Sequence, residues 1–380
     1  MPTRPLRRGW TTGACATAAA KAAYAALLTG AFPDPVEITL PRGERPSFAL
    51  ATTRRDGDAA TAGIIKDAGD DPDVTHGALV LATVRLGAAG SGVTFRAGEG
   101  VGTVTRPGLP IPPGEPAINP VPRRMMREAI GEVARAHNAL ISGLPEISTN
   151  SAQVGQARLA CDVEIEIAIP GGATLAQRTL NGRLGIVGGL SILGTTGIVI
   201  PYSCSSWIHS IRSGIDVARA IGLTHVAGAT GATSEAAVRK LYGLPEPGLI
   251  DMGDFVGGML KYIRAHPLPR VSIAGGVAKM TKLAQGLLDL HSKRGAVDLA
   301  ALAALADAAG GSAGLHARIV AANTAAEAFA HAQAEGIALG DAVARAARDV
   351  ALRVVEGRGV AIDVVVFDRE GMLVGRAAFG

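Results

Sequence analysis

Four aspartates crowd into one short stretch of the 380-residue sequence, Lys66-Asp67-Ala-Gly-Asp70-Asp71-Pro-Asp73-Val-Thr-His76. Like charges held close together raise the pKa of a carboxyl group, so Asp67 or Asp70 could act as a general base. Four carboxylates so close together suggest a metal site, but their spacing does not match a calcium-binding loop, and we assign no residue as a metal ligand. Turn formation and helix capping explain an Asp-Asp-Pro-Asp run equally well. Asp67 and Asp70 are therefore candidate catalytic residues, with a purely structural role as the alternative.

A glycine-dense segment at residues 181–199 reads NGRLGIVGGLSILGTTGIV. Backbone without side chains can approach a ligand closely and offer its N–H groups, although the dinucleotide fingerprint G-x-G-x-x-G is absent. Residues 184–208 carry no formal charge, but their glycines and Pro201 make a poor membrane-spanning helix. We therefore expect a cradle for a small molecule, in which Gly189→Val or Gly194→Val blocks binding and leaves the fold largely intact. The predicted cofactor contacts in this segment are Gly185, Gly188, Gly189, Gly194, Thr195, Thr196 and Gly197.

Further candidates follow predicted strands in the second half of the chain. Ligands gather beyond the carboxyl ends of strands in open parallel sheets. Asp251 ends one such strand and could hold a ribose diol, although it could equally cap the next helix. Lys279 opens a helix after Gly275-Gly276 and could bind an anion, or it could simply be exposed. His291 could face the same cleft, although complementing a helix dipole is the favoured interpretation.

The composition limits the class of protein. Apolar residues make up 48% and charged residues 18% of a chain long enough for two domains, so most of it should fold. The net charge is only +4, and no basic run is interleaved with aromatic residues, so nothing supports nucleic-acid binding. Arginine far outnumbers lysine, which suits a ligand with many carboxylates, although codon bias explains it more simply. Three scattered cysteines fit a reducing cytoplasm and no disulfide framework.

Periodicity predicts an α/β protein of two domains. Residues 1–165 should form a mixed α+β domain, and residues 166–380 a domain with a mainly parallel sheet covered by helices, joined between 140 and 190. In the first, we expect helices at 14–28 and 123–139, a hairpin of 36–40 with 48–53, and strands at 78–85, 93–96 and 162–169. In the second, we expect strands at 198–201, 225–229, 249–250 and 271–274, helices at 206–221, 234–242, 255–265 and 277–290, three Ala-rich helical stretches, and a closing hairpin of 361–367 with 372–376.

Taken in order, several blocks of the chain resemble the cobalt-precorrin-5B C(1)-methyltransferase family (CbiD) of the anaerobic cobalamin pathway. The likeness covers nearly the whole chain, and the blocks are specific together although each is weak alone. They are Gly9-Trp-Thr-Thr-Gly-Ala-Cys-Ala, the acidic stretch from Lys66, Pro107-Gly-Leu-Pro, Gly114-Glu-Pro-Ala-Ile-Asn-Pro-Val-Pro-Arg123, the glycine-dense segment, and Gly253-Asp-Phe-Val-Gly.

The resemblance implies methyl transfer from S-adenosylmethionine to ring carbon 1 of a cobalt tetrapyrrole, with cobalt present only as part of the substrate. Such an in-line displacement depends mainly on orientation and needs no covalent nucleophile. The carboxylates of an anionic tetrapyrrole would give several side chains a binding role: Thr11, Thr12, Arg123, Arg124, Lys279 and His291.

Two other functions remain open at this point. A nucleotide-dependent ligase or phosphotransferase would place Lys279 on phosphate and the acidic stretch on Mg²⁺. A non-catalytic corrinoid-binding protein would bind the tetrapyrrole and no methyl donor. We expect neither a nucleic-acid nor a membrane partner, and a homo-oligomer is left open.

Overall fold

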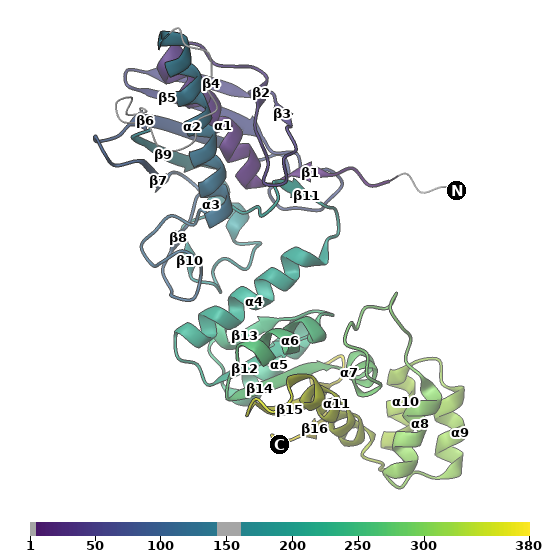
Figure 1. The fold of residues 1–380 in the computed structure, drawn as a ribbon. Helices are drawn as coiled ribbons and strands as arrows, with labels where there is room; N and C mark the ends of the chain where they lie inside the picture. Colours follow the sequence, from purple (N-terminus) through teal and green to yellow (C-terminus); the bar gives the residue numbers. More distant parts are fainter. Residues whose placement is uncertain (1–4, 143–160) are drawn as a thin grey trace. The chain divides into compact units, whose positions relative to one another are not determined.

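The protein is known here from a computed structural model that describes residues 5–142 and 161–380. Its contacts divide the chain into unit 1, Met1–Ser203, and unit 2, Cys204–Gly380, each of mixed α and β structure (Figure 1). The predicted fold class is confirmed. The division falls later than the predicted boundary at 165/166 and beyond the range 140–190, of which residues 143–160 lie outside the described part.

Strand pairing explains why the glycine-dense segment belongs to unit 1. Strand β10 (Ile186–Val187) pairs antiparallel with β8 (Thr103–Val104). Strand β11 (Ile198–Val199) pairs antiparallel with β1 (Gly9–Trp10). The prediction that residues 198–201 begin the parallel sheet of the second domain is therefore wrong.

The main sheet of unit 1 has five strands in the order β4-β5-β6-β9-β7. All neighbours are antiparallel except β7 and β9. Burial alternates along β9, so Val163, Ile165 and Ile167 face the core and the glutamates between them face outward, as the alternating sequence predicts. The strands are β4 (Thr52–Asp56), β5 (Ala59–Ile65), β6 (Leu79–Leu86), β7 (Val93–Ala97) and β9 (Val163–Ala168).

Two helices pack on this sheet, α1 (Thr12–Thr29) and α2 (Pro120–Ser142) (Figure 1). Helix α1 is almost wholly buried, and its small alanine side chains let it lie close to β5, β6 and α2. Strands β2 (Val36–Glu37) and β3 (Ser47–Phe48) form a hairpin shorter than predicted, because β4 pairs with β5 instead. Helix α3 (Gly172–Ala176) forms one short turn.

Unit 2 has a five-stranded sheet in the order β13-β12-β14-β15-β16. Its first four strands are parallel, and β16 closes the sheet antiparallel to β15. The mainly parallel sheet and the closing hairpin are thus confirmed. The strands are β12 (His225–Ala229), β13 (Leu249–Asp251), β14 (Arg270–Gly276), β15 (Ala361–Phe367) and β16 (Leu373–Ala377).

Helices cover both faces of the unit 2 sheet. Helix α5 (Ala232–Tyr242) packs on the face that carries Ala227, Ala274 and Val365. The other face is covered by α4 (Cys204–Ala220), α6 (Val256–Ala265), α7 (Val277–Ala284) and α11 (Leu339–Val355). Helix α7 ends before the predicted residue 290, because Gly286 leaves the helical region at φ 88°.

Four helices lie between α7 and β15, one more than the three Ala-rich stretches predicted (Figure 1). The last of them is α11, and three helices precede it. They are α8 (Leu299–Ala308), α9 (Ala313–Ala321) and α10 (Ala325–Ala334). Asp298, Ser312 and Thr324 cap their N-termini. In the described part of the chain, every helix is too short or too polar to cross a bilayer.

Candidate functional site

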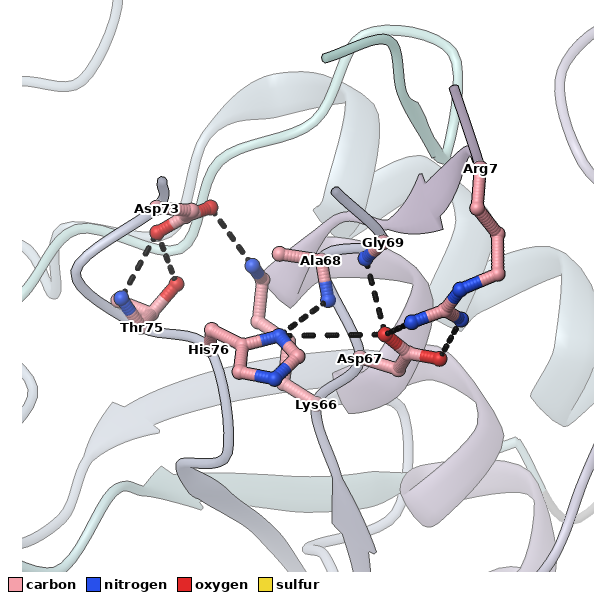
Figure 2. Close-up of polar contacts among 8 residues, drawn as sticks. All are labelled: Arg7, Lys66, Asp67, Ala68, Gly69, Asp73, Thr75 and His76. Atoms are coloured by element: carbon pink, nitrogen blue, oxygen red, sulfur yellow. Dashed lines mark hydrogen bonds and ion pairs between the residues drawn. The ribbon is translucent and has the colours of Figure 1, made fainter. Parts of the chain in front are cut away.

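The acidic stretch forms a loop between β5 and β6 that binds Arg7 of the N-terminal segment (Figure 2). The Asp67 carboxylate accepts hydrogen bonds from Nη1 and Nη2 of Arg7. It also accepts the backbone N–H of Gly69 at 2.9 Å. The backbone N–H of Arg7 donates to Asp70 Oδ2 at 2.6 Å. The N–H of Tyr202 donates to Asp71 Oδ1 at 2.8 Å. The loop therefore holds the chain where it enters β1 and again where it leaves β11.

The electrostatics of Asp67 are opposite to the expectation. The hydrogen bond from Arg7, followed by that from Gly69, lowers the pKa of Asp67 to about 2. A carboxylate with so low a pKa is a weak proton acceptor near neutral pH. The expected rise of the pKa from crowded like charges is wrong for Asp67, because its own contacts with Arg7 and Gly69 stabilise the charged form.

A buried ion pair supports the same loop (Figure 2). The side chain of Lys66 is 1% exposed, and its Nζ lies 2.7 Å from Asp73 Oδ2. Burial alone would raise the pKa of Asp73, but the charge of Lys66 and the hydrogen bonds from Lys66 and Thr75 outweigh burial and lower it. His76 Nδ1 accepts the N–H of Ala68 at 3.1 Å. The motif that begins at Lys66 identifies the acidic residues of this site. It does not identify Arg7, which lies outside the motif.

The glycine-dense segment is packed against its own unit. A side chain at Gly189 would overlap the carbonyl of Gly100, and one at Gly194 would overlap Thr11. Gly185 and Gly197 are closed in the same way by Arg106 and Leu40. The expectation that valine at Gly189 or Gly194 leaves the fold intact is therefore wrong. Gly188 and Thr195 are exposed and Thr196 is half-buried, so these three remain accessible to a ligand.

The candidate tetrapyrrole contacts of unit 1 are mostly engaged within the protein. The Arg123 guanidinium donates to the carbonyls of Ile118 and Pro116 at 2.8 and 2.9 Å, and it pairs with Glu115 at 3.1 Å. It therefore fixes the proline-rich loop.

Of the other three candidates in unit 1, two are engaged or buried within the protein and one is exposed. Thr11 Oγ1 caps α1 by accepting the N–H of Ala14, and Thr12 is buried. Arg124, 59% exposed and 3.8 Å from Glu128, is the one of these candidates that offers its charge to solvent.

At the carboxyl end of the unit 2 sheet, two side chains and a backbone carbonyl that follow three of its strands meet. Lys279, three residues after β14, donates to the carbonyl of Thr230, the residue after β12, at 2.8 Å. Its Nζ also lies 3.1 Å from Oδ1 of Asp254, which follows β13. Sequence reasoning named Lys279 and missed Asp254, although it lies within the Gly253-Asp-Phe-Val-Gly block.

The two other candidates of unit 2 belong to the same end of the sheet. The carbonyl of Asp251 accepts the indole N–H of Trp207 at 2.9 Å. His291 is exposed and follows Leu290, whose N–H donates to the carbonyl of Asp254 at 2.9 Å. Asp251, Lys279 and His291 thus lie in unit 2, and the remaining predicted residues lie in unit 1.

Within residues 5–142 and 161–380, no group of three or more His, Cys, Asp or Glu side chains is placed to hold a metal ion. The acidic loop accordingly consists of ion pairs and turns.

Comparison with known proteins identifies the family. Two family models match, CbiD over residues 1–201 and the CbiD C-terminal domain over residues 289–378. Proteins named cobalt-precorrin-5B C(1)-methyltransferase from Bradyrhizobium sp. (strain BTAi1) and Agrobacterium fabrum (strain C58) are 61% and 60% identical to the chain; the alignments cover 98% of it and 94% and 93% of theirs. The protein of that name from Methylorubrum extorquens is 59% identical over 98% of both chains.

A solved structure, that of cobalamin biosynthesis protein (cbiD) from Archaeoglobus fulgidus, is 26% identical over 76% of this chain and 83% of its own, with a TM-score of 0.38. So low a score supports no argument about individual residues. One family model matches more than half of the chain, and relatives of that family are about 60% identical over almost all of it. The chain therefore belongs to the CbiD family.

Proposed function

We propose that this protein transfers a methyl group from S-adenosylmethionine to carbon 1 of cobalt-precorrin-5B during corrin ring synthesis. The observation that carries the proposal is 61% identity over 98% of the chain to a relative with that activity in its name. When bound, S-adenosylmethionine supplies an electrophilic methyl group. The residues of the protein then have to bind donor and acceptor and align them.

We place the donor at the carboxyl end of the unit 2 sheet. Parallel strands flanked by helices on both faces bind ligands at this end. Asp251, the last residue of β13, is the candidate for the ribose diol. On the glycine-dense segment, Gly188, Thr195 and Thr196 remain candidate ligand contacts because they are accessible.

The acceptor carries carboxylates, and Arg124 is the exposed unit 1 cation proposed to meet one of them. Asp67 and Asp70 are proposed as positioning residues, since they hold Arg7 and with it the entry to β1. The low pKa of Asp67 argues against a role as general base.

Calorimetric titration of the full chain tests the proposal. S-adenosylhomocysteine should bind, and incubation of S-adenosylmethionine with cobalt-precorrin-5B should give a product heavier by one methylene. If ATP with Mg²⁺ raised the melting temperature and S-adenosylhomocysteine did not, the nucleotide-dependent ligase would be favoured. Tetrapyrrole binding with no donor affinity would favour the corrinoid carrier. No heat from S-adenosylhomocysteine, with or without tetrapyrrole, would count against methyl transfer.

A further inference from the structure

The order of strands in unit 2 creates one point where chain connections diverge. From β12 the chain passes through α5 to β13 on one side, and β14 has β15 as its neighbour on the other side. The carboxyl ends of adjacent β12 and β14 therefore form a topological switch point, where open parallel sheets bind their ligands.

The backbone at this point is open. Gly231 caps α5 and Gly276 caps α7, and neither helix has a side-chain cap. A Cβ at Gly231 would meet no described atom within 4 Å, and one at Gly276 would meet only the carbonyl oxygen of Phe367 at 4.0 Å. No side chain therefore caps the first N–H groups of either helix.

A pair of opposite charges stands beside this opening. Lys279 Nζ is fixed by the carbonyl of Thr230 at 2.8 Å and lies 3.1 Å from Asp254 Oδ1. Asp254 Oδ1 is shielded from solvent, yet it receives no well-aligned hydrogen bond from any residue that the structure describes. The side chains of Lys279 and Asp254 remain 37% and 23% exposed. Because both side chains are partly exposed, Asp254 can meet one further cation and Lys279 one further anion.

We propose that Lys279 and Asp254 bind the zwitterionic amino-acid end of the methyl donor. The α-carboxylate of the donor meets Lys279 and the uncapped N–H groups, and its α-ammonium meets the exposed part of the Asp254 carboxylate. This assignment rests on the proposed function and deepens it. A triphosphate fits the pair poorly, because the Asp254 carboxylate would repel it.

Calorimetry with two nucleosides tests the assignment on the full chain. S-adenosylhomocysteine carries the amino-acid end, and 5′-methylthioadenosine lacks it. The unaltered protein should bind S-adenosylhomocysteine at least about tenfold more tightly than 5′-methylthioadenosine. Lys279→Gln and Asp254→Asn should each weaken S-adenosylhomocysteine about tenfold and leave methylthioadenosine within about twofold. Lys240→Gln, an exposed lysine on α5, is the matched control and should change neither affinity.

The outcomes separate this inference from the proposed function. Failure of the unaltered protein to bind either nucleoside overturns both. Normal S-adenosylhomocysteine affinity in Lys279→Gln and Asp254→Asn overturns the inference alone, as does an equal loss for the two nucleosides. Thermal unfolding checks that each variant is folded. Should Lys279→Gln fail to fold, Lys279→Arg and Asp254→Asn decide, because arginine keeps the charge and should retain the preference for S-adenosylhomocysteine.

Discussion

Gly189 and Gly194 in unit 1 differ from Gly231 in unit 2 in what surrounds them. Gly189 and Gly194 in unit 1 are closed by Gly100 and Thr11, so their missing side chains let two parts of the same unit touch. Gly231, at the end of the sheet in unit 2, opens onto space that the described residues leave empty. A glycine can thus mark a close approach of two backbone segments or an open stretch of backbone, and the residues around it decide which.

The charged residues show the same contrast. In unit 1 the Asp67 carboxylate accepts three hydrogen bonds from Arg7 and Gly69, and Lys66 is buried with Asp73. In unit 2 the pair of Lys279 and Asp254 is partly exposed, and an Asp254 oxygen still lacks a well-aligned donor. Charges that complete their contacts within the chain support the fold, whereas charges that do not can bind a ligand.

Replacing a closed glycine should give the largest effect. Gly189→Ala forces a Cβ into the carbonyl of Gly100, which accepts the N–H of Leu190 at 2.8 Å, so backbone must move. We expect the free energy of unfolding to fall by about 3 kcal/mol in urea titrations. Gly182→Ala, in the same segment with no described atom within 4 Å, should stay within about 0.5 kcal/mol. Equal stability of the two variants would break the distinction between closed and open glycines.

Removing one partner from each ion pair should separate supporting charges from binding charges. Asp73→Asn leaves the 1% exposed Lys66 ammonium without its counter-charge and should cost about 3 kcal/mol of unfolding free energy at pH 7. Lys279→Gln, in a pair 37% and 23% exposed, should cost less than about 1 kcal/mol. Urea unfolding measures both, and a larger loss for Lys279→Gln would mean that its pair supports the fold.

The smallest expected effect is a difference in pH dependence between two aspartates. Asp67 in unit 1 has its pKa lowered to about 2, from an ordinary value of 3.8, chiefly by Arg7. Because its folded pKa is depressed, its contribution to stability is present above pH 3.8 and is lost as pH falls toward 2. Unit 1 of the Asp67→Asn variant should lose less stability than the unaltered protein over that interval.

Asp363 in unit 2 should show the opposite sign. Burial raises its pKa, despite hydrogen bonds from Ser272 and Tyr242. Its contribution is therefore full below pH 3.8 and is lost as pH rises through the folded pKa, so Asp363→Asn should flatten that decline.

One tryptophan lies in each unit, so the fluorescence of Trp10 and Trp207 can follow the two units separately during unfolding. The same sign of pH dependence for Asp67 and Asp363 would contradict the electrostatic part of the comparison.

Local patterns predicted the elements well where pairing partners are regular. The short apolar runs at 225–229 and 271–274 form β12 and β14 as expected, since buried parallel strands need little but apolar, strand-forming residues. Residues 198–201 look equally strand-like, yet β11 pairs with Gly9–Trp10 in unit 1. A strand sequence specifies what it buries and says little about which strand it meets.

The sequence was enough to determine the family and the fold class, because blocks in a set order and hydrophobic periods can be read along the chain. Tertiary structure decided that Asp67 pairs with Arg7, that Gly189 meets Gly100, and that Lys279 reaches Asp254. These contacts join segments that are separate in the sequence. Hydrogen bonds and ion pairs depend on a few ångströms of separation, and only folding sets those distances.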